Sequence, residues 1–441
     1  MSSPRQTQKK SGDQNYFIHC FTKKLNGLSE RYFQLYVFTA FVLLELFLAV
    51  FLDTTIEFDA ITRASIGLNY YAGEIGLDFI EWLPFFGAGG VWLPLFQWLI
   101  GLIVIFPLQL TDIHVSIAVF VGETLSAFAT AGTALYVYKI LRNFFNLDRV
   151  QSSLSFAFFL AHGLWLAYGS QSMTDNLSVF LLIATIYHMT IFLTRETHST
   201  QHLVLASILA ALNNFLRYEP WALIFLTAIS FISFNIWKMI QKRQVDWWRL
   251  EQSFRLINFL VLPSLVCVVW LLYTFRVTGS FFEAAEWILA NNNWGFAPFT
   301  QYNPLLSLGE FFLVMTVATI FWVILPIFAF WIMRNVNWLN KQKSEVSKFL
   351  FLQWIILGSF AITTYYLIFM GINTGWPRHF FYIIPFVVIA CTVLYSVGSV
   401  KMQKRLRSAL YLGLFLSVGT ILVLHIIHLL FIGMYPEFII L

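Results

Sequence analysis

The stretch from Asp53 to Pro94 concentrates side chains that can do acid–base and ionic chemistry. It follows a long apolar run, and its single base is Arg63. Its acids are Asp53, Glu57, Asp59, Glu74, Asp78 and Glu81. Carboxylates at the mouth of a hydrophobic bundle are costly unless they have partners or a chemical task. Glu57, Asp59 and Arg63 are therefore candidate site residues, and in a helix Asp59 and Arg63 lie one turn apart and can pair.

Five later positions offer charges at the ends of apolar runs or in the long loop expected over 276–310. Arg217 and Glu219 join two such runs, Asp175 opens another, and Arg378 precedes the tenth expected span. Glu283 lies in the segment 276–310. Arginine suits bidentate binding of phosphate or carboxylate and stays charged when buried. Two interpretations stay open: these arginines neutralise nearby acids, or they hold an anion. A helix cap is the structural alternative for Asp175.

The composition identifies the class of protein. The 441 residues are 59% hydrophobic, 19% aromatic and only 11% charged, whereas a soluble domain is typically about 25% charged. This predicts a multi-pass helical membrane protein. The net charge of +5 is not a nucleic-acid signature, because the bases form short clusters between apolar runs. The three cysteines are far apart and predict neither a disulfide framework nor a metal site.

An all-α fold with about 11 transmembrane helices follows from the apolar runs, since a span needs about 20 apolar residues. The expected spans are 33–52, 114–138, 153–170, 175–194, 202–217, 219–237, 255–275, 311–333, 349–370, 380–398 and 408–432. A further apolar stretch, 92–110, contains Pro94 and Pro107. Interfacial helices are expected within the large first outer loop, 53–113.

The basic clusters decide the expected topology. If residues 1–32 form a cytosolic basic tail and 92–110 does not cross, the later clusters all face the cytosol. Only Arg63, Arg217, Arg276 and Arg378 then face outward. The expected organisation is this tail, a membrane domain over 33–398 with outer loops 53–113 and 276–310, and a last helix with a short outer tail over 399–441.

Five motifs occur in a characteristic order, and all of them are expected on the outer side of the membrane. They are Glu57-Phe58-Asp59-Ala60, Trp92-Leu93-Pro94-Leu95, Thr174-Asp175, Arg217-Tyr218-Glu219, and Pro377-Arg378 ahead of Pro385. Their order over about residues 33–390 resembles the GT-C glycosyltransferases, specifically the branch of protein O-mannosyltransferases and lipid A aminoarabinose transferase. Two features depart from that branch. Phe58 separates the paired acids, and only a short tail follows the last expected span, so loops or a partner are expected to recognise the acceptor.

The resemblance implies transfer of a sugar, with inversion, from a polyprenyl-phosphate carrier to a lipid, glycan or protein acceptor on the outer side of the plasma membrane. Such a reaction needs a base for the acceptor hydroxyl and cations for the departing phosphate. Asp59 is the expected base and Glu57 the alternate. Arg378 is the first choice for the donor phosphate and Arg217 the second.

The remaining candidates, Asp175, Glu219, Arg63 and Glu283, are expected to orient the sugar or the acceptor. Asp175 and Glu219 can instead pair with the arginines. No cofactor is required by the sequence, although Mg²⁺ or Mn²⁺ between Asp59 and Asp175 stays open. Membrane lipids are expected partners and nucleic acid is not.

Two other classes of function compete with this interpretation. A lipid or solute transporter or flippase would favour internal repeats and broken polar helices at the midplane, and no convincing repeat is found. A non-catalytic membrane subunit could keep the same fold without needing the acids and arginines. Neither the sugar nor the acceptor follows from the sequence.

Overall fold

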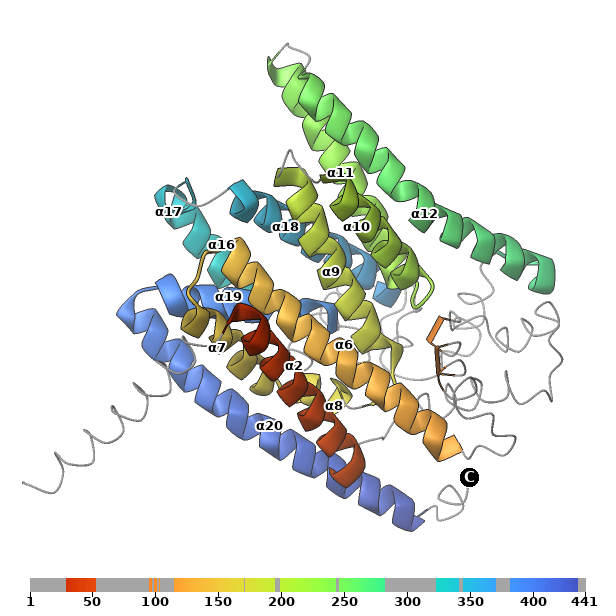
Figure 1. Cartoon of the computed structure of the whole chain (residues 1–441), viewed down its shortest axis with the longest axis vertical. Helices are drawn as coiled ribbons and strands as arrows, with labels where there is room; N and C mark the ends of the chain where they lie inside the picture. The colour runs from red at the N-terminus through yellow and green to blue at the C-terminus, as the bar shows by residue number, and fades with distance from the viewer. Residues whose placement is uncertain are drawn as a thin grey trace, which may run out of the picture.

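The computed structural model describes residues 29–52, 95–96, 99–100, 103, 115–169, 171–194, 199–242, 246–281, 323–340, 344–369 and 381–434. All regular secondary structure in these residues is helical, which confirms the all-α class (Figure 1). The helices are α2 (Glu30–Phe47), the π-helical turn η1 (Leu48–Leu52), α6 (Val115–Asn143), α7 (Arg149–Leu160), α8 (Gly163–Gly169), α9 (Thr174–Thr194), α10 (Ser199–Asn214), α11 (Glu219–Lys242), α12 (Trp247–Thr278), α16 (Ile324–Arg334), α17 (Val336–Asn340), α18 (Ser344–Phe369), α19 (Ile384–Val397) and α20 (Val400–Met434).

Seven helical segments within the described residues are long and apolar enough to cross a membrane. They are Glu30–Val50, Ile117–Asn143, Thr174–Thr194, Glu219–Gln241, Ser253–Arg276, Glu345–Ile362 and Val400–Val423. Two shorter apolar helices, Ile324–Arg334 and Phe381–Val397, accompany them. The protein is therefore a multi-pass membrane protein, while the count of eleven spans is not confirmed.

The expected span 153–170 is wrong as a single helix. It divides into α7 and α8, with a turn at Ala161–His162. At the start of α8, a Cβ on Gly163 would lie 3.0 Å from the Thr420 hydroxyl and 3.1 Å from the Ser417 Cα. The backbone of Gly163 thus approaches α20 closely at this break, and an added side chain would require α20 to shift.

The hydrophobic core is centred on α9 and α19. Every residue of α19 from Ile384 to Leu394 is buried, and so is nearly all of α9. A helix that is apolar on all sides belongs in the interior of a bundle. The outer helices differ, since α12 exposes Val261 and α20 exposes Phe415, at 63% and 76% of their surface. These exposed apolar faces suit contact with lipid.

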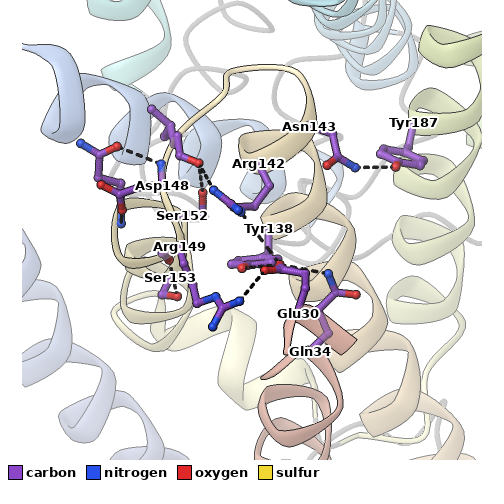
Figure 2. A network of polar contacts seen from close by, with 12 residues as sticks. Glu30, Gln34, Tyr138, Arg142, Asn143, Asp148, Arg149, Ser152, Ser153 and Tyr187 are labelled. Atoms are coloured by element: carbon purple, nitrogen blue, oxygen red, sulfur yellow. Dashed lines mark hydrogen bonds and ion pairs between the residues drawn. The ribbon is translucent and has the colours of Figure 1, made fainter. Parts of the chain in front are cut away.

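A polar network closes one end of the bundle. Figure 2 shows Tyr138, Gln34 and Arg149 converging on the carboxylate of Glu30. The Tyr138 hydroxyl donates to Glu30 Oε1 at 2.7 Å, and Arg149 Nη2 donates to Oε2 at 3.0 Å. Nearby, Asp148 and the third residue of α7 form a reciprocal capping box. The network fixes the start of α2 against the end of α6 and the start of α7.

The direction of α6 defines the two ends of the bundle. Near its start, the Ser126 hydroxyl donates to the carbonyl of Met173, which immediately precedes α9. At its end, Asn143 donates to the Tyr187 hydroxyl, well along α9. Helices α6 and α9 are therefore parallel neighbours, and both run from the Met173 end toward the Glu30 network. At a rise of about 1.5 Å per residue, Ser126 and Asn143 are roughly 25 Å apart along α6.

The segment 92–110 is described at five positions, all of them helical. Phe96 and Ile100 are fully buried and lie in one cluster with Ala118, Leu181 and Leu216. The segment thus packs on α6, α9 and the end of α10, near Met173. Its interfacial placement stays a prediction, as do the expected domain boundaries and the orientation of the bundle in the membrane.

Candidate functional site

An arginine held between two carboxylates forms the centre of the candidate site. Arg217 Nη1 lies 2.9 Å from Asp175 Oδ1. Its Nη2 and Nε donate to the two carboxylate oxygens of Glu219, at 2.6 and 3.1 Å. Arg217 Nη1 also donates to the Thr174 hydroxyl at 3.4 Å. The side chains of Asp175, Arg217 and Glu219 are 1%, 11% and 19% exposed, so the triad is largely withdrawn from solvent.

The positions of the two acids follow from the helices that carry them. Asp175 lies in the first turn of α9, and Glu219 is the first residue of α11. The N-terminal end of a helix favours negative charge. Pro220 follows Glu219, and a proline is tolerated in a first helical turn, where its missing N–H has no intrahelical acceptor. Two helix starts therefore bring both carboxylates to the turn that carries Arg217.

The electrostatics of the triad keep Arg217 charged. Burial alone would lower the pKa of the Arg217 guanidinium, but Asp175 and then Glu219 raise it well above its ordinary value. Two carboxylates and one guanidinium leave the triad one formal negative charge in excess. An anionic ligand would need a further cation here. The pairing that the sequence left open for Asp175 and Glu219 is thus present, while a phosphate-binding role for Arg217 stays a prediction.

A second polar layer lies behind the triad, and the sequence analysis did not identify it. The Ser178 hydroxyl donates to Asn213 Oδ1 at 2.5 Å and lies 2.6 Å from the Tyr382 hydroxyl. All three residues are buried. Ser178 comes from α9, Asn213 from the end of α10, and Tyr382 from the turn that leads into α19. The signal in the sequence that could have revealed this layer is a serine and an asparagine within otherwise apolar runs.

The turn between α10 and α11 is fixed from several sides. Trp221 Nε1 donates to the carbonyl of Asn214 at 2.8 Å, and Trp270 Nε1 donates to the Tyr218 hydroxyl at 2.9 Å. Asn214 Nδ2 in turn donates to the carbonyl of Pro263 at 3.2 Å. The Phe215 carbonyl accepts from the N–H of Leu95, the last residue of the Trp/Pro motif. Arg217 is therefore preorganised by its surroundings.

The turn before α9 packs closely on α6 and α2. A Cβ on Gly122 would lie 1.8 Å from the Ser172 hydroxyl oxygen, so a larger residue fits there only if Ser172 moves. A Cβ on Gly169 would lie 2.8 Å from both carboxylate oxygens of Glu45. Glu45 is fully buried and makes no hydrogen bond with the described residues. A buried acid thus lies behind the turn that leads to Asp175.

Five of the predicted site residues lie outside the described residues: Asp59, Glu57, Arg63, Glu283 and Arg378. Their convergence with Asp175 and Arg217 stays a prediction. Arg378 is close in sequence to Tyr382, which contacts the second polar layer. Among the described residues, no three His, Cys, Asp or Glu side chains come together as a metal site. These residues alone therefore do not supply a ligand set for the divalent cation.

Comparison with known proteins bears on the fold. No protein-family model matches the sequence, and no curated protein matches it. The crystal structure of ArnT from Cupriavidus metallidurans bound to undecaprenyl phosphate is similar, with a TM-score of 0.57 and 13% sequence identity. The match covers 84% of this chain and 62% of that one. This chain has an ArnT-like fold.

The ArnT-like fold confirms the GT-C-like fold class that the order of motifs predicted. The chain spans less than two thirds of the length of ArnT. At 13% identity the likeness establishes the fold and not the reaction. Membership of the GT-C glycosyltransferases, and of one branch of them, stays a prediction.

Proposed function

We propose that this protein transfers a sugar from a polyprenyl-phosphate carrier to an acceptor on the extracytoplasmic side of the plasma membrane, with inversion at the sugar. The observation that carries the proposal is the ArnT-like fold, since the similar ArnT structure contains undecaprenyl phosphate. The buried triad of Asp175, Arg217 and Glu219 at one end of the bundle adds ionic chemistry in a fixed frame.

The arrangement of charge supports an outward-facing site. The triad lies beside Met173 at the start of α9, whereas Arg142, Arg149 and Glu30 lie at the far end of α6. With basic residues facing the cytosol, the triad faces outward. Nucleotide sugars are cytosolic, so a reaction on the outer side calls for a lipid-borne donor. An apolar bundle with a charged rim suits a donor that has a long apolar tail and a phosphate head.

The proposed step is a single displacement. The acceptor oxygen attacks the anomeric carbon as the bond from that carbon to the phosphate oxygen breaks. Asp59 takes the acceptor proton, with Glu57 as the alternate base, and polyprenyl phosphate leaves with the bonding electron pair. Arg378 stabilises the leaving phosphate. Attack from the face opposite the leaving group inverts the anomeric carbon.

The triad acts in this scheme by positioning. Because two acids hold Arg217, its side chain fixes the end of the bundle at which α9 and α11 begin. The excess negative charge of the triad favours a neighbouring cation, and the other arginines expected on the outer side are Arg63, Arg276 and Arg378. Asp175, Glu219 and Glu283 then orient sugar hydroxyls. No step requires a metal, and Mg²⁺ or Mn²⁺ stays an optional addition to the scheme.

The test is transfer of radiolabelled sugar from polyprenyl phosphate to endogenous acceptors in membranes that contain the protein. Asp59→Asn should lower transfer by about 10²- to 10⁴-fold, the usual contribution of a general base. Asp148→Asn is the matched control. It makes the same chemical change at the helix cap of α7, where asparagine caps as well as aspartate, and it should transfer at the wild-type rate.

Several outcomes would count against the proposal. If Asp59→Asn transfers normally, the base moves to Glu57, and if the double variant is also active, the site as drawn is refuted. No transfer by folded wild-type protein across mannose, glucose, galactose and aminoarabinose donors would favour the non-catalytic alternative. Movement of intact donor across the bilayer without bond cleavage would favour the flippase.

A further inference from the structure

A groove lies between α10 and α12 at the periphery of the helix bundle, away from the triad. It has a volume of about 380 Å³, within the roughly 300–1,000 Å³ typical of small-molecule sites. The two helices run in parallel, since Thr200 meets Arg255 near their starts and Asn214 meets Pro263 further along. The groove therefore follows the helices and has a distinct polar end and apolar end.

The apolar end suits a hydrocarbon chain. Val204 and Ile208 line it from α10 and Leu262 from α12. They are 52%, 41% and 38% exposed. Val204 and Ile208 lie one helical turn apart on α10, and together with Leu262 they make both walls of this end apolar. In a membrane these walls are in contact with lipid tails.

The polar end contains an amide that needs a partner. Asn258 lines the groove, is exposed, and lies within the candidate span Ser253–Arg276. It makes no hydrogen bond with the described residues. Polar groups that face lipid are costly unless they are satisfied. The partner for Asn258 must therefore come from outside this part of the chain.

One turn before Asn258, Arg255 lines the same groove. Its Nη2 donates to Glu251 at 2.6 Å and its Nη1 to the Thr200 hydroxyl at 3.5 Å. A guanidinium has five donors, so it can hold these groups and still bind a phosphate oxygen. Residues 238–255 carry five Lys or Arg against two acids. Trp247, 75% exposed, lies just before the span, which is typical of the membrane interface.

We propose that this groove binds one anionic phospholipid of the surrounding bilayer. Arg255 holds the phosphate, Asn258 donates to an ester oxygen of the glycerol backbone, and one acyl chain lies along Val204, Ile208 and Leu262. The excess positive charge near the groove selects an anionic over a zwitterionic headgroup. This inference does not depend on the proposed glycosyl transfer.

Native mass spectrometry of purified protein tests the proposal, with phosphatidylglycerol or phosphatidylcholine added to detergent micelles. Wild-type protein should retain phosphatidylglycerol preferentially. The double variant Arg255→Gln, Asn258→Leu should retain it about tenfold less, as expected for loss of a charge-assisted contact. Arg255→Lys should keep part of the binding, because it keeps the charge without the planar fork.

The control is Arg405→Gln, which removes one positive charge from the exposed start of α20 and should retain lipid as the wild type does. If the double variant does not fold, Asn258→Leu alone replaces it in the lipid-retention test. This single variant only places an apolar residue on a lipid-facing surface. Equal retention of both lipids, or unchanged retention in the variants, would overturn the proposal. A dimer that dissociates in the variants with no change in bound lipid would assign the groove to a second copy instead.

Discussion

Arg217 Nη1 lies 2.9 Å from Asp175 Oδ1, although nearly all of α9 and the whole of α10 separate these residues along the chain. The contact ties the start of α9 to the turn between α10 and α11 (Figure 1). The same guanidinium holds Glu219 through two hydrogen bonds. One side chain thus fixes three helix ends at the rim where the reaction is proposed.

Replacing Arg217 should destabilise the protein more than replacing either acid. Arg217→Gln leaves two carboxylates without their cation, and breaking a buried ion pair from one side costs about 3–5 kcal/mol. Asp175→Asn leaves Arg217 paired with Glu219 and should cost less. Thermal unfolding of the purified variants in detergent gives the order. A smaller loss for Arg217→Gln than for Asp175→Asn would contradict the central position of Arg217.

The close approach of α6 to the turn before α9 should tolerate no added methyl group. Gly122→Ala places a Cβ 1.8 Å from the Ser172 oxygen, and such overpacking costs about 1–3 kcal/mol. Thermal unfolding should show this loss, and transfer should fall with it because Asp175 shifts. Ser172→Gly in the same chain should restore much of both.

Gly358→Ala is the matched control for that experiment. Gly358 lies within α18, and a Cβ there has open space around it. The change should therefore be neutral or stabilising, by up to about 1 kcal/mol, through helix propensity. If both glycine variants lose stability equally, the contact with Ser172 is not the cause.

Arg378 should affect donor binding as well as the chemical step. Arg378→Ala removes a charge-assisted contact to the phosphate, so the apparent KM for the donor should rise and kcat should fall. Arg378→Lys should recover only part of each, because a point charge does not reproduce the bidentate fork. Donor-titrated transfer assays separate the two constants. Full recovery with lysine would show that charge alone is needed.

Single cysteines report the predicted orientation. Positions 112 and 143 should be labelled from opposite sides of the membrane, because 53–113 is expected outside and the end of α6 inside. Membrane-impermeant maleimide on intact cells and on opened membranes makes the comparison, in a background with Cys20, Cys267 and Cys391 replaced by serine or alanine. Labelling of both positions from one side would refute the topology, whereas labelling of 112 from the inside and 143 from the outside would place 92–110 across the membrane.

The sequence alone determined the class of protein and the kind of fold. Long apolar runs must form helices in a membrane, since every backbone polar group has to be satisfied internally. The order of five motifs, which includes Thr174-Asp175 and Arg217-Tyr218-Glu219, predicted a GT-C-like fold that the likeness to ArnT confirms. The positions of Asp175 and Glu219 at helix starts were also accessible, because each follows a polar turn and opens an apolar run.

Tertiary structure decided which groups meet. Periodicity cannot show that Ser178, Asn213 and Tyr382 share hydrogen bonds, because they come from three helices that are adjacent only after packing. The close approach of Gly163 to α20 at the break between α7 and α8 was likewise undetermined, because no local pattern encodes it. Whether Arg217 holds an acid or a phosphate was equally undetermined, because an arginine takes whichever anion the fold brings within reach, and here the fold brings Asp175 and Glu219.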